Sequence, residues 1–496
     1  MSDLKLPIGW AFTTLADAGT WTSGGTPSRS HPEYFNGDIP WIKTGDLNEG
    51  PVDDIPENIT QKGLENSSAK LFPVGTLLMA MYGATIGKLG ILKFNAATNQ
   101  ACSALLPHGM TKDIIPYTFY YLMYERHNFK QIGQGDAQPN ISQTIIKKHP
   151  FILAPLPEQH RIVEALDSYF SRLDEAVMLL ERVQKNLKRY RASVLKAAVE
   201  GRLVPTEAEL ARKEKRDFEP ASELLKRILI ERRKKWEDTE LAKMKAAGKV
   251  PKDDKWKSKY KEPAAPDTSG LPELPEGWCW ASVEQLIVSP LINGHSVQTS
   301  KIGFPVLRLT ALRNGNVNLK ERKIGHWSEN EALHFRIHKG DIFVARGNGS
   351  LDLLGRGGLV TVDPDPVAFP DTFIRIQLND EIFNHRLFMR FWDTNIVRHH
   401  LERRAKTTAG IYKINQVELG CTPLPLPPPV EQTRLLDELE RIDTIACRIA
   451  EDSESLGPRC NRLRQSILKW AFEGKLADQN PNDEPASVLL ERIRNS

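Results

Sequence analysis

The sequence contains no long apolar run and only five cysteines among its 496 residues. A helix needs roughly 20 apolar residues to cross a bilayer, and no segment approaches that length. The first ten residues, MSDLKLPIGW, also lack the apolar centre of a secretion signal. The cysteines are odd in number and scattered, which is typical of a reducing compartment rather than of a disulfide framework. We therefore expect a cytoplasmic globular protein with no membrane partner.

Motifs for catalysis are missing as well. The segment GATIGKL at residues 83–89 is one residue too short between its glycines for a phosphate loop, and it ends in leucine, which cannot bind Mg²⁺. The Asp-Pro pairs at residues 363–366 lack the aromatic residue on which methyltransferases stack a flipped base. No histidines and cysteines have the spacing of zinc ligands. We expect no catalytic residue, metal ligand or bound cofactor, which favours a binding or targeting role.

The charge of the chain is distributed unevenly. The formal net charge is only +4, but residues 202–262 contain 19 lysines and arginines against 13 aspartates and glutamates. A solvated charged helix and a phosphate-binding surface would both explain such a region. Net charge alone therefore neither requires nor excludes a nucleic acid.

The chain is a duplication. Four short segments of the first half return in the same order in the second half, two of them with the same offset of 273 residues. A solenoid would have a period of roughly 20 to 50 residues, so these repeats indicate two related halves. Between them, residues 11–148 barely resemble residues 281–419, so the halves share a frame and differ in their heads. The repeated segments are LPIGW at 6–10 and LPEGW at 274–278, EQHR at 158–161 and EQTR at 431–434, LKAAVEGRL at 195–203 and LKWAFEGKL at 468–476, and EPAS at 219–222 and 484–487.

Each half contains one long helix with a coiled-coil pattern, in which apolar residues alternate at spacings of four and three. We expect the two helices to pair, antiparallel if the halves are related by a pseudo-twofold axis. Gly457 and Pro458 predict an interruption of the second helix, because proline lacks the N–H that a helix interior needs. In the first helix, one predicted row is Ile162, Tyr169, Ala176, Val183, Tyr190 and Ala197, and the other is Leu166, Leu173, Leu180, Leu187 and Val194. In the second helix the predicted seam is Leu435, Leu439, Ile442, Ala446, Ile449, Leu456, Leu463, Ile467 and Trp470.

The segments outside these helices predict β-rich heads, because short apolar runs are broken by glycine, asparagine and proline. The predicted fold class is α+β, with two β-rich recognition domains joined by long antiparallel coiled-coil helices in pseudo-twofold duplicated halves. The predicted domains are a first head at 1–155, a first long helix at 156–205, a charged helical extension and linker at 206–270, a second head at 271–429, and a second long helix with a tail at 430–496.

The heads carry polar, glycine-rich loops with interleaved cations and tyrosines. Arg and Lys read guanine edges, Asn and Gln read adenine edges, and backbone N–H groups of glycine-rich turns hold phosphates. Ordinary hairpin turns have the same composition, so that interpretation stays open for each residue. The candidate DNA-binding residues of the first head are Thr22, Ser23, Lys43, Thr44, Tyr82, Thr85, Gln134, Gln138 and Asn140. Those of the second head are Arg308, Arg346, Asn348, Ser350, Arg403, Arg404, Lys406, Thr407, Tyr412 and Lys413.

The order of the repeated segments resembles that of the specificity (S) subunits of type I restriction-modification systems. The resemblance is carried by the LPxGW openings at Leu6 and Leu274, the EQxR exits at Glu158 and Glu431, and the EGxL helix ends at Glu200 and Glu473. Their duplicated order covers nearly all of the chain.

The resemblance implies a non-catalytic subunit with two target-recognition domains, each of which reads half of a bipartite site in double-stranded DNA. It implies helical spacers that fix the distance between the half-sites. It also implies two adenine methyltransferase subunits, which bring S-adenosylmethionine, and restriction (motor-nuclease) subunits, which bring ATP and Mg²⁺. About 36 residues of heptad would span about 54 Å, which exceeds one groove repeat of roughly 34 to 36 Å.

Two other classes of protein stay open at this point. A self-sufficient DNA methyltransferase or nuclease would modify DNA alone when given its cofactors. A coiled-coil scaffold would show no salt-dependent binding to duplex DNA. The DNA sequence that is recognised does not follow, because the heads differ and loop contacts depend on three-dimensional geometry.

Overall fold

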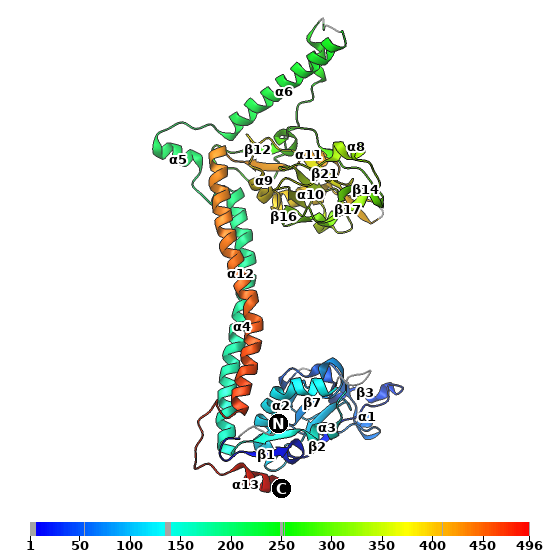
Figure 1. The fold of residues 1–496 in the computed structure, drawn as a ribbon, viewed down its shortest axis with the longest axis vertical. Coiled ribbons are helices and arrows are strands. Elements are labelled where there is room, and N and C mark those ends of the chain that lie inside the picture. The colour runs from blue at the N-terminus through cyan, green and yellow to red at the C-terminus, as the bar shows by residue number, and fades with distance from the viewer. Residues whose placement is uncertain are drawn as a thin grey trace. The chain divides into compact units, whose positions relative to one another are not determined.

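The computed structural model describes residues 6–53, 55–133, 140–248, 251, 253–408 and 410–495. The chain divides into two compact units, one formed by residues 1–183 together with 452–496 and the other by residues 184–451. Each unit contains one head of mixed helices and strands and a part of each long helix (Figure 1), which confirms the predicted α+β class. No helix in the described ranges is long and apolar enough to cross a membrane.

The strands of the first head are β1 (Ala11–Thr14), β2 (Trp21–Ser23), β3 (Phe35–Ile42), β4 (Gly50–Val52), β5 (Asn58–Ile59), β6 (Leu71–Phe72), β7 (Leu77–Ala80), β8 (Leu89–Leu92), β9 (Ala96–Thr98), β10 (Cys102–Leu105) and β11 (Pro150–Leu153). One sheet has the strand order β2-β10-β7-β8-β4, and a second has the order β5-β3-β9-β6. The short pair of β1 and β11 joins the beginning of the head to its end, with Ala11 opposite Leu153. The helices of this head are α1 (Gln61–Glu65), α2 (Thr111–Gly133) and α3 (Gln143–Lys148).

The core of the first head is completed by residues from the end of the chain. The ring of Phe472 lies 5.3 Å from Tyr117 and 5.1 Å from Tyr121, measured between ring centroids. Both tyrosines belong to α2, and their hydroxyl groups donate to backbone carbonyls of β11. Burial of rings of this size contributes strongly to the stability of a core. The first head therefore depends on a residue more than 300 positions away in the sequence.

The strands of the second head are β12 (Cys279–Ser282), β13 (Ile292–Asn293), β14 (Thr299–Leu307), β15 (Leu312–Arg313), β16 (Gly315–Val317), β17 (Arg322–Gly325), β18 (Ile342–Ala345), β19 (Gly347–Asn348), β20 (Gly357–Leu359), β21 (Phe373–Ile376), β22 (Lys406–Thr408), β23 (Ile411–Lys413) and β24 (Pro423–Leu426). The main sheet has the order β13-β21-β18-β20-β16-β15, beside the pair of β14 with β17 and a small sheet of β19, β23 and β22. Strands β12 and β24 close this head as β1 and β11 close the first. Its helices are α7 (Val283–Leu286), α8 (Glu329–Ala332), α9 (His385–Trp392), α10 (Asn395–Arg404) and α11 (Gln416–Gly420).

The basic region after the first long helix contains α5 (Glu207–Glu214) and α6 (Ala221–Ala246). Only the first turns of α6 are buried, at Ala221, Leu224, Leu225 and Ile228. Farther along, the rings of Trp236, Trp256 and Tyr260 pack together and hold the returning chain against the helix. Most of α6 is therefore a charged, solvated helix.

The long helices α4 (Leu156–Val199) and α12 (Pro429–Phe472) pair within each unit. In the first unit Arg464 forms an ion pair with Asp174 and lies 5.2 Å from the ring centroid of Phe170. In the second unit the Nε atom of Arg191 lies 3.9 Å from the carboxylate of Asp443. Residue numbers rise along one helix as they fall along the other, which confirms the predicted antiparallel pairing.

The seam between the helices uses one predicted row of α4 and replaces the other. Leu166 and Val194 of the leucine row are buried, as predicted. In contrast, Tyr169, Val183 and Tyr190 are 44%, 41% and 53% exposed, so their assignment to the seam was wrong. In α12 the predicted residues from Leu435 to Ala446 are buried, but Ile449, Leu463 and Trp470 are 40%, 51% and 55% exposed, so these three were also wrongly assigned. On a helix, the residues three and four positions after a leucine both lie beside it, so either row can complete the seam. The row that lies in the seam, buried or half-buried, is Phe170, Val177, Gln184, Arg191 and Ala198.

Helix α12 continues through Gly457 and Pro458, so the predicted interruption was wrong. Pro458 is exposed, and its ring stands on the outer side of the helix pair. On the inner side, Ser453 and Cys460 are only 5% and 7% exposed. Tertiary packing of these small residues against α4 maintains the helix where local propensity alone would end it.

The repeated segments meet inside each unit. In the first unit the Nε1 atom of Trp10 donates to Glu158 at 2.9 Å, and the backbone N–H of Ala486 donates to the carbonyl of Gly9 at 2.8 Å. In the second unit the same bonds join Trp278 to Glu431 at 2.9 Å, and Ala221 to Gly277 at 2.8 Å. Each head is thus closed by its own opening and exit segments and by a helix from the other half of the chain. This helix is α13 (Ala486–Arg494) for the first head and α6 for the second.

Both EGxL segments end in a turn that only glycine permits. Gly201 and Gly474 have φ angles of 64° and 68°, in the left-handed region that favours glycine. A Cβ atom on either would overlap the ring of a proline in an LPxGW segment, Pro275 for Gly201 and Pro7 for Gly474. The repeats are therefore explained by closure of the frame.

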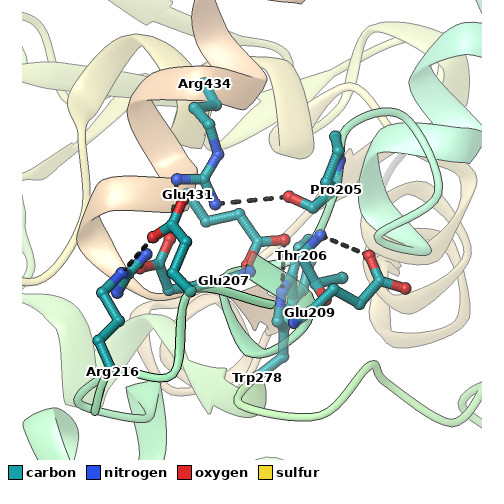
Figure 2. A network of polar contacts seen from close by, with 9 residues as sticks. Pro205, Thr206, Glu207, Glu209, Arg216, Trp278, Glu431 and Arg434 are labelled. Atoms are coloured by element: carbon teal, nitrogen blue, oxygen red, sulfur yellow. Dashed lines mark hydrogen bonds and ion pairs between the residues drawn. The ribbon is translucent and has the colours of Figure 1, made fainter. Parts of the chain in front are cut away.

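An ion network ties α5 to the exit of the second head (Figure 2). Glu207 lies 2.7 Å from the Nη1 atom of Arg434 and 2.6 Å from the Nη2 atom of Arg216, and its backbone N–H donates to Glu431 at 2.8 Å. The side chain of Glu207 is only 4% exposed. Burial alone would raise the pKa of this carboxyl group, but the hydrogen bonds from both arginines outweigh burial and lower it. Glu207 is therefore held as a carboxylate.

Replacing Pro458 with alanine should stabilise α12. Alanine restores an N–H that can bond to the carbonyl of residue 454, and proline costs about 3 kcal/mol more than alanine in a helix interior. We expect the free energy of unfolding to rise by about 1 to 3 kcal/mol, with slower amide hydrogen exchange over residues 452–462. Arg459→Ala, an exposed neighbour, is the control and should change neither quantity. Equal exchange rates in P458A and the parent chain would contradict the prediction.

Replacing Glu207 with glutamine should destabilise the second unit in a pH-dependent way. The substitution leaves two arginines without their carboxylate, which costs about 3 kcal/mol for a buried pair. The folded pKa of Glu207 lies below its ordinary value of 4.5, so its stabilisation is complete above pH 4.5 and is lost as the pH falls through the folded pKa. Urea unfolding of E207Q and the parent chain should therefore differ at pH 7 and converge in acid.

The matched control for E207Q is Glu214→Gln. Glu214 bonds to the same Arg216 at 2.6 Å, but its side chain is 53% exposed. Exposed ion pairs contribute about 1 kcal/mol or less, so E214Q should leave stability almost unchanged. An equal loss in both variants, or a loss in E207Q that does not depend on pH, would refute the role of the buried carboxylate.

Candidate nucleic-acid interface

The candidate loops of the first head converge on one turn, residues 98–101. The backbone N–H of Gly25 donates to the carbonyl of Thr98, and that of Asn99 donates to the carbonyl of Ile42, both at 2.9 Å. On the other side of the turn, the N–H of Met81 donates to the carbonyl of Ala101 at 2.8 Å. The segments 22–26, 43–44 and 81–85 are therefore neighbours in space. We call residues 98–101 the first hub turn.

The strand arrangement explains this convergence. β9 runs parallel to β3, so both strands end at the same edge of their sheet, beside the start of β10. Gly24 allows the loop after β2 to reach that edge, because a Cβ atom at this position would overlap the carbonyl oxygen of Thr98. Asn140 joins the cluster through a β-bridge to Tyr82. Gln134 and Gln138, which were also predicted, lie outside the described residues.

The predicted side chains of the first head differ in whether they already have hydrogen-bond partners within the protein. Lys43 bonds to Glu57 at 2.7 Å. Burial alone would raise the pKa of Glu57, but hydrogen bonds from Lys43 and Arg29 together lower it. The hydroxyl group of Thr22 accepts a bond from Lys70 at 2.9 Å. The hydroxyl of Thr85 donates to the carbonyl of Tyr82, whose own side chain is 43% exposed. The remaining two are Ser23, which pairs with Ser103 inside the sheet, and Thr44, which begins a short helical turn after Lys43.

The second head builds the same arrangement around residues 369–372, which we call the second hub turn. The N–H of Arg346 donates to the carbonyl of Thr372 at 2.8 Å, as Met81 does to Ala101. The N–H of Ile414 donates to the carbonyl of Arg346 at 2.9 Å, as Ile141 does to Met81. Arg308 follows β14 as Lys43 follows β3. The two heads therefore place different side chains at equivalent positions.

Arg308 lies in a groove of about 440 Å³ beside the second hub turn. Thr310, Lys323 and His295 line the same groove, and the Nε atom of Arg308 is 3.3 Å from the carbonyl of Arg322. The guanidinium group therefore keeps most of its donors available for another partner.

The small sheet of β19, β22 and β23 carries most of the other predicted residues of the second head. Gly347 is opposite Lys413, and Asn348 is opposite Tyr412. Lys406 pairs with Lys413 in the neighbouring strands, and Thr407 pairs with Tyr412. Asn348 accepts the backbone N–H of Ser350 at 3.1 Å, which shapes the following turn. These residues and Arg346 form one polar edge.

Arg403 and Arg404 are separated from that edge. They lie in the last turn of α10 and line a cavity of about 470 Å³ together with linker residues such as Asp267 and Ser269. Lys406 bonds to Glu418 of α11 at 3.2 Å. The basic run 403–406, which is continuous in the sequence, therefore divides between two surfaces.

Sequence reasoning missed the hub turns themselves. Gln100 and Asp371 occupy these turns, and neither lies in a glycine-rich or basic segment. The one signal available was a polar residue two positions before β10 or β21, where a buried strand begins. Among the described residues, no group of three or more His, Cys, Asp or Glu side chains could hold a metal ion.

Each head gathers cationic, amide and hydroxyl groups around one turn, and the frame is duplicated, which is an arrangement suited to binding DNA at two places. Residues 7–181 match the family model of the type I restriction modification DNA specificity domain. The chain is 25% identical to the specificity subunit of the EcoKI type I restriction enzyme of Escherichia coli strain K12, over 100% of this chain and 97% of that protein. It is 26% identical to the StySPI specificity subunit of Salmonella potsdam, over 99% of this chain and 96% of that one.

Solved structures have the same fold. The HsdS subunit of Thermoanaerobacter tengcongensis matches with a TM-score of 0.55 and 15% identity, over 96% of this chain and 99% of that chain. A chain from a type I R-M system, solved to describe complex assembly and conformational transition, matches with a TM-score of 0.60 and 15% identity, over 95% of this chain and 99% of that chain. Over nearly its whole length the chain is similar to the specificity subunits of type I restriction-modification systems. These relatives are named as specificity subunits, and they give no support to a scaffold or to a self-sufficient methyltransferase or nuclease.

Proposed function

We propose that this chain recognises a bipartite DNA target, with one half-site bound by the loops around each hub turn. The observation that carries the proposal is the equivalence of the two clusters. Backbone bonds at the same positions hold Met81 in one head and Arg346 in the other. Lys43 and Arg308 each directly follow a strand, β3 or β14. Base edges differ in their hydrogen-bond donors and acceptors. Two half-sites of different sequence therefore require different side chains at equivalent positions of the two heads.

The proposed partners are two adenine methyltransferase subunits and restriction (motor-nuclease) subunits, in the cytoplasm. In this proposal S-adenosylmethionine enters with the methyltransferase subunits, ATP and Mg²⁺ enter with the restriction subunits, and this chain binds none of them. The helix pair keeps the half-sites at a fixed number of base pairs, and the methylation state of the target decides between modification and restriction.

The exposed apolar rows of the long helices are the proposed docking face for the methyltransferase subunits. Exposed rows of this kind on a soluble protein are typical of interaction sites. In the second unit the row includes Tyr190, Ile445 and Ile449. In the first unit it consists of Tyr169, Met178, Leu179, Val183, Leu463 and Trp470, which are 41% to 62% exposed.

Exchanging the first head for that of another specificity subunit should change one half-site only. The exchange of residues 11–153 replaces β1 and β11 together, so the paired strands come from the same protein. The buried pair of Glu125 and His149 is also replaced as a unit. The exchange leaves Trp10 and Glu158 in place to close the new head. Mapping of methylated adenines in cells that carry the partner subunits should then show one altered and one unaltered half-site. Changes in both half-sites would contradict the modular proposal.

Removing cations from the polar edge of the second head should weaken binding to any duplex. Each phosphate contact contributes a slope of about −0.9 to the dependence of log K on log salt concentration. The double variant with Arg346→Ala and Lys413→Ala should therefore reduce the slope by up to about 2 units, measured by fluorescence anisotropy. The control is Arg212→Ala, because Arg212 is 68% exposed and paired with Glu276. An unchanged slope in the double variant would refute the phosphate role.

A further inference from the structure

An acidic side chain lies in the groove beside the second hub turn. Asp371 is half-buried and lines the groove together with Arg308, Thr310 and Thr372. Its carboxylate has no hydrogen bond or ion pair with any other residue in the described part of the chain. Among the described residues, the guanidinium group of Arg308 in the same groove bonds to one acceptor, the backbone carbonyl of Arg322. Because Asp371 is only half-buried, its carboxylate is open to solvent and is available to accept a hydrogen bond from a ligand in the groove.

Asp371 is the structural equivalent of Gln100 in the first head. The N–H of Phe373 donates to the carbonyl of Pro370 at 3.1 Å, and the N–H of Cys102 donates to the carbonyl of Asn99 at 3.3 Å. Each turn thus has the same backbone bond across two intervening residues, and the first of the two is Asp371 in one head and Gln100 in the other. Gln100 accepts a hydrogen bond from the hydroxyl of Thr26.

The chemistry of these side chains restricts what they can contact on DNA. A carboxylate repels phosphate groups, so an acid on a DNA-binding surface gains nothing from the backbone of the duplex. In the major groove, Asp and Glu accept from the N4 amino group of cytosine, whereas Asn and Gln bond in bidentate fashion to the N6 and N7 atoms of adenine. An arginine beside the acid suits guanine O6 and N7.

We propose that Asp371 and Gln100 are base-reading residues at equivalent positions of the two heads. Asp371 accepts from the amino group of a cytosine in the second half-site, and Gln100 binds an adenine in the first. Arg308 binds a guanine next to, or paired with, that cytosine. This assignment rests on the proposed function, because it takes the hub turns as the surfaces that face the base edges.

The test is a selection of duplexes randomised over both half-sites, performed with the full chain assembled with its methyltransferase subunits. The parent complex is expected to require a cytosine at one position of the second half-site. Asp371→Asn exchanges an acceptor for an amide of the same shape. At that position the preference for cytosine should fall by roughly 10-fold or more, adenine should become favoured, and the first half-site should stay unchanged.

The matched control is Asp363→Asn. Asp363 is an exposed carboxylate of the same head and lies outside the groove. Its substitution makes the same change in net charge, so it should leave the selected sequence as it is. The reciprocal variant Gln100→Glu tests the first head, where the preferred base should change from adenine to cytosine.

Two outcomes would overturn the assignment. If Asp371→Asn raises affinity for all duplexes equally and leaves base preference unchanged, the acid only repels the DNA backbone. If Asp371→Asn and Asp363→Asn change the selected sequence alike, the effect is one of net charge. Failure of the proposed function has a different signature, because the parent complex itself would then select no bipartite sequence.

Discussion

The structure depends on a buried bond between a tryptophan and a glutamate, made once in each unit. Trp10 donates to Glu158, and Trp278 donates to Glu431, and the glutamates are only 2% and 0% exposed. Burial raises the pKa of both carboxyl groups, and the indole N–H is one of the contacts that offset it. The bond ties the first residues of a head to the first turn of the long helix that leaves it. The strand pairs that close each head, and hence the positions of its loops, follow from this closure.

Much of the frame could be predicted from the sequence because its determinants are local. The repeated segments, the proline-rich exits and the heptads mark the duplication, the heads and the antiparallel helix pair. The row that includes Tyr169 and Tyr190 was misassigned because α4 has more apolar faces than one partner helix can cover. The interruption at Pro458 was wrongly predicted because a local penalty of about 3 kcal/mol is smaller than the packing of two long helices.

The candidate interface was predicted only in part, for a different reason. Loops such as 22–26 and 81–85 carry a compositional signal of their own, but the turns that bring them together do not. Gln100 and Asp371 gain their importance from parallel strand pairs and backbone bonds between distant segments. Conversely, Arg403 and Lys413 look alike in the sequence and lie on different surfaces. Contacts between residues far apart in the chain decide which polar side chains share a site.

The composition of the two units has a consequence for synthesis. The second unit is one continuous stretch, residues 184–451, whereas the first unit needs residues 452–496 as well. Phe472 belongs to the core of the first head, and Arg494 bonds to Asp17 at 3.0 Å. Domains fold as their residues leave the ribosome, so the head that is translated first is the last to be completed. Until then it exposes the apolar surface that Phe472 will cover, and this interval is when the nascent chain is most open to aggregation.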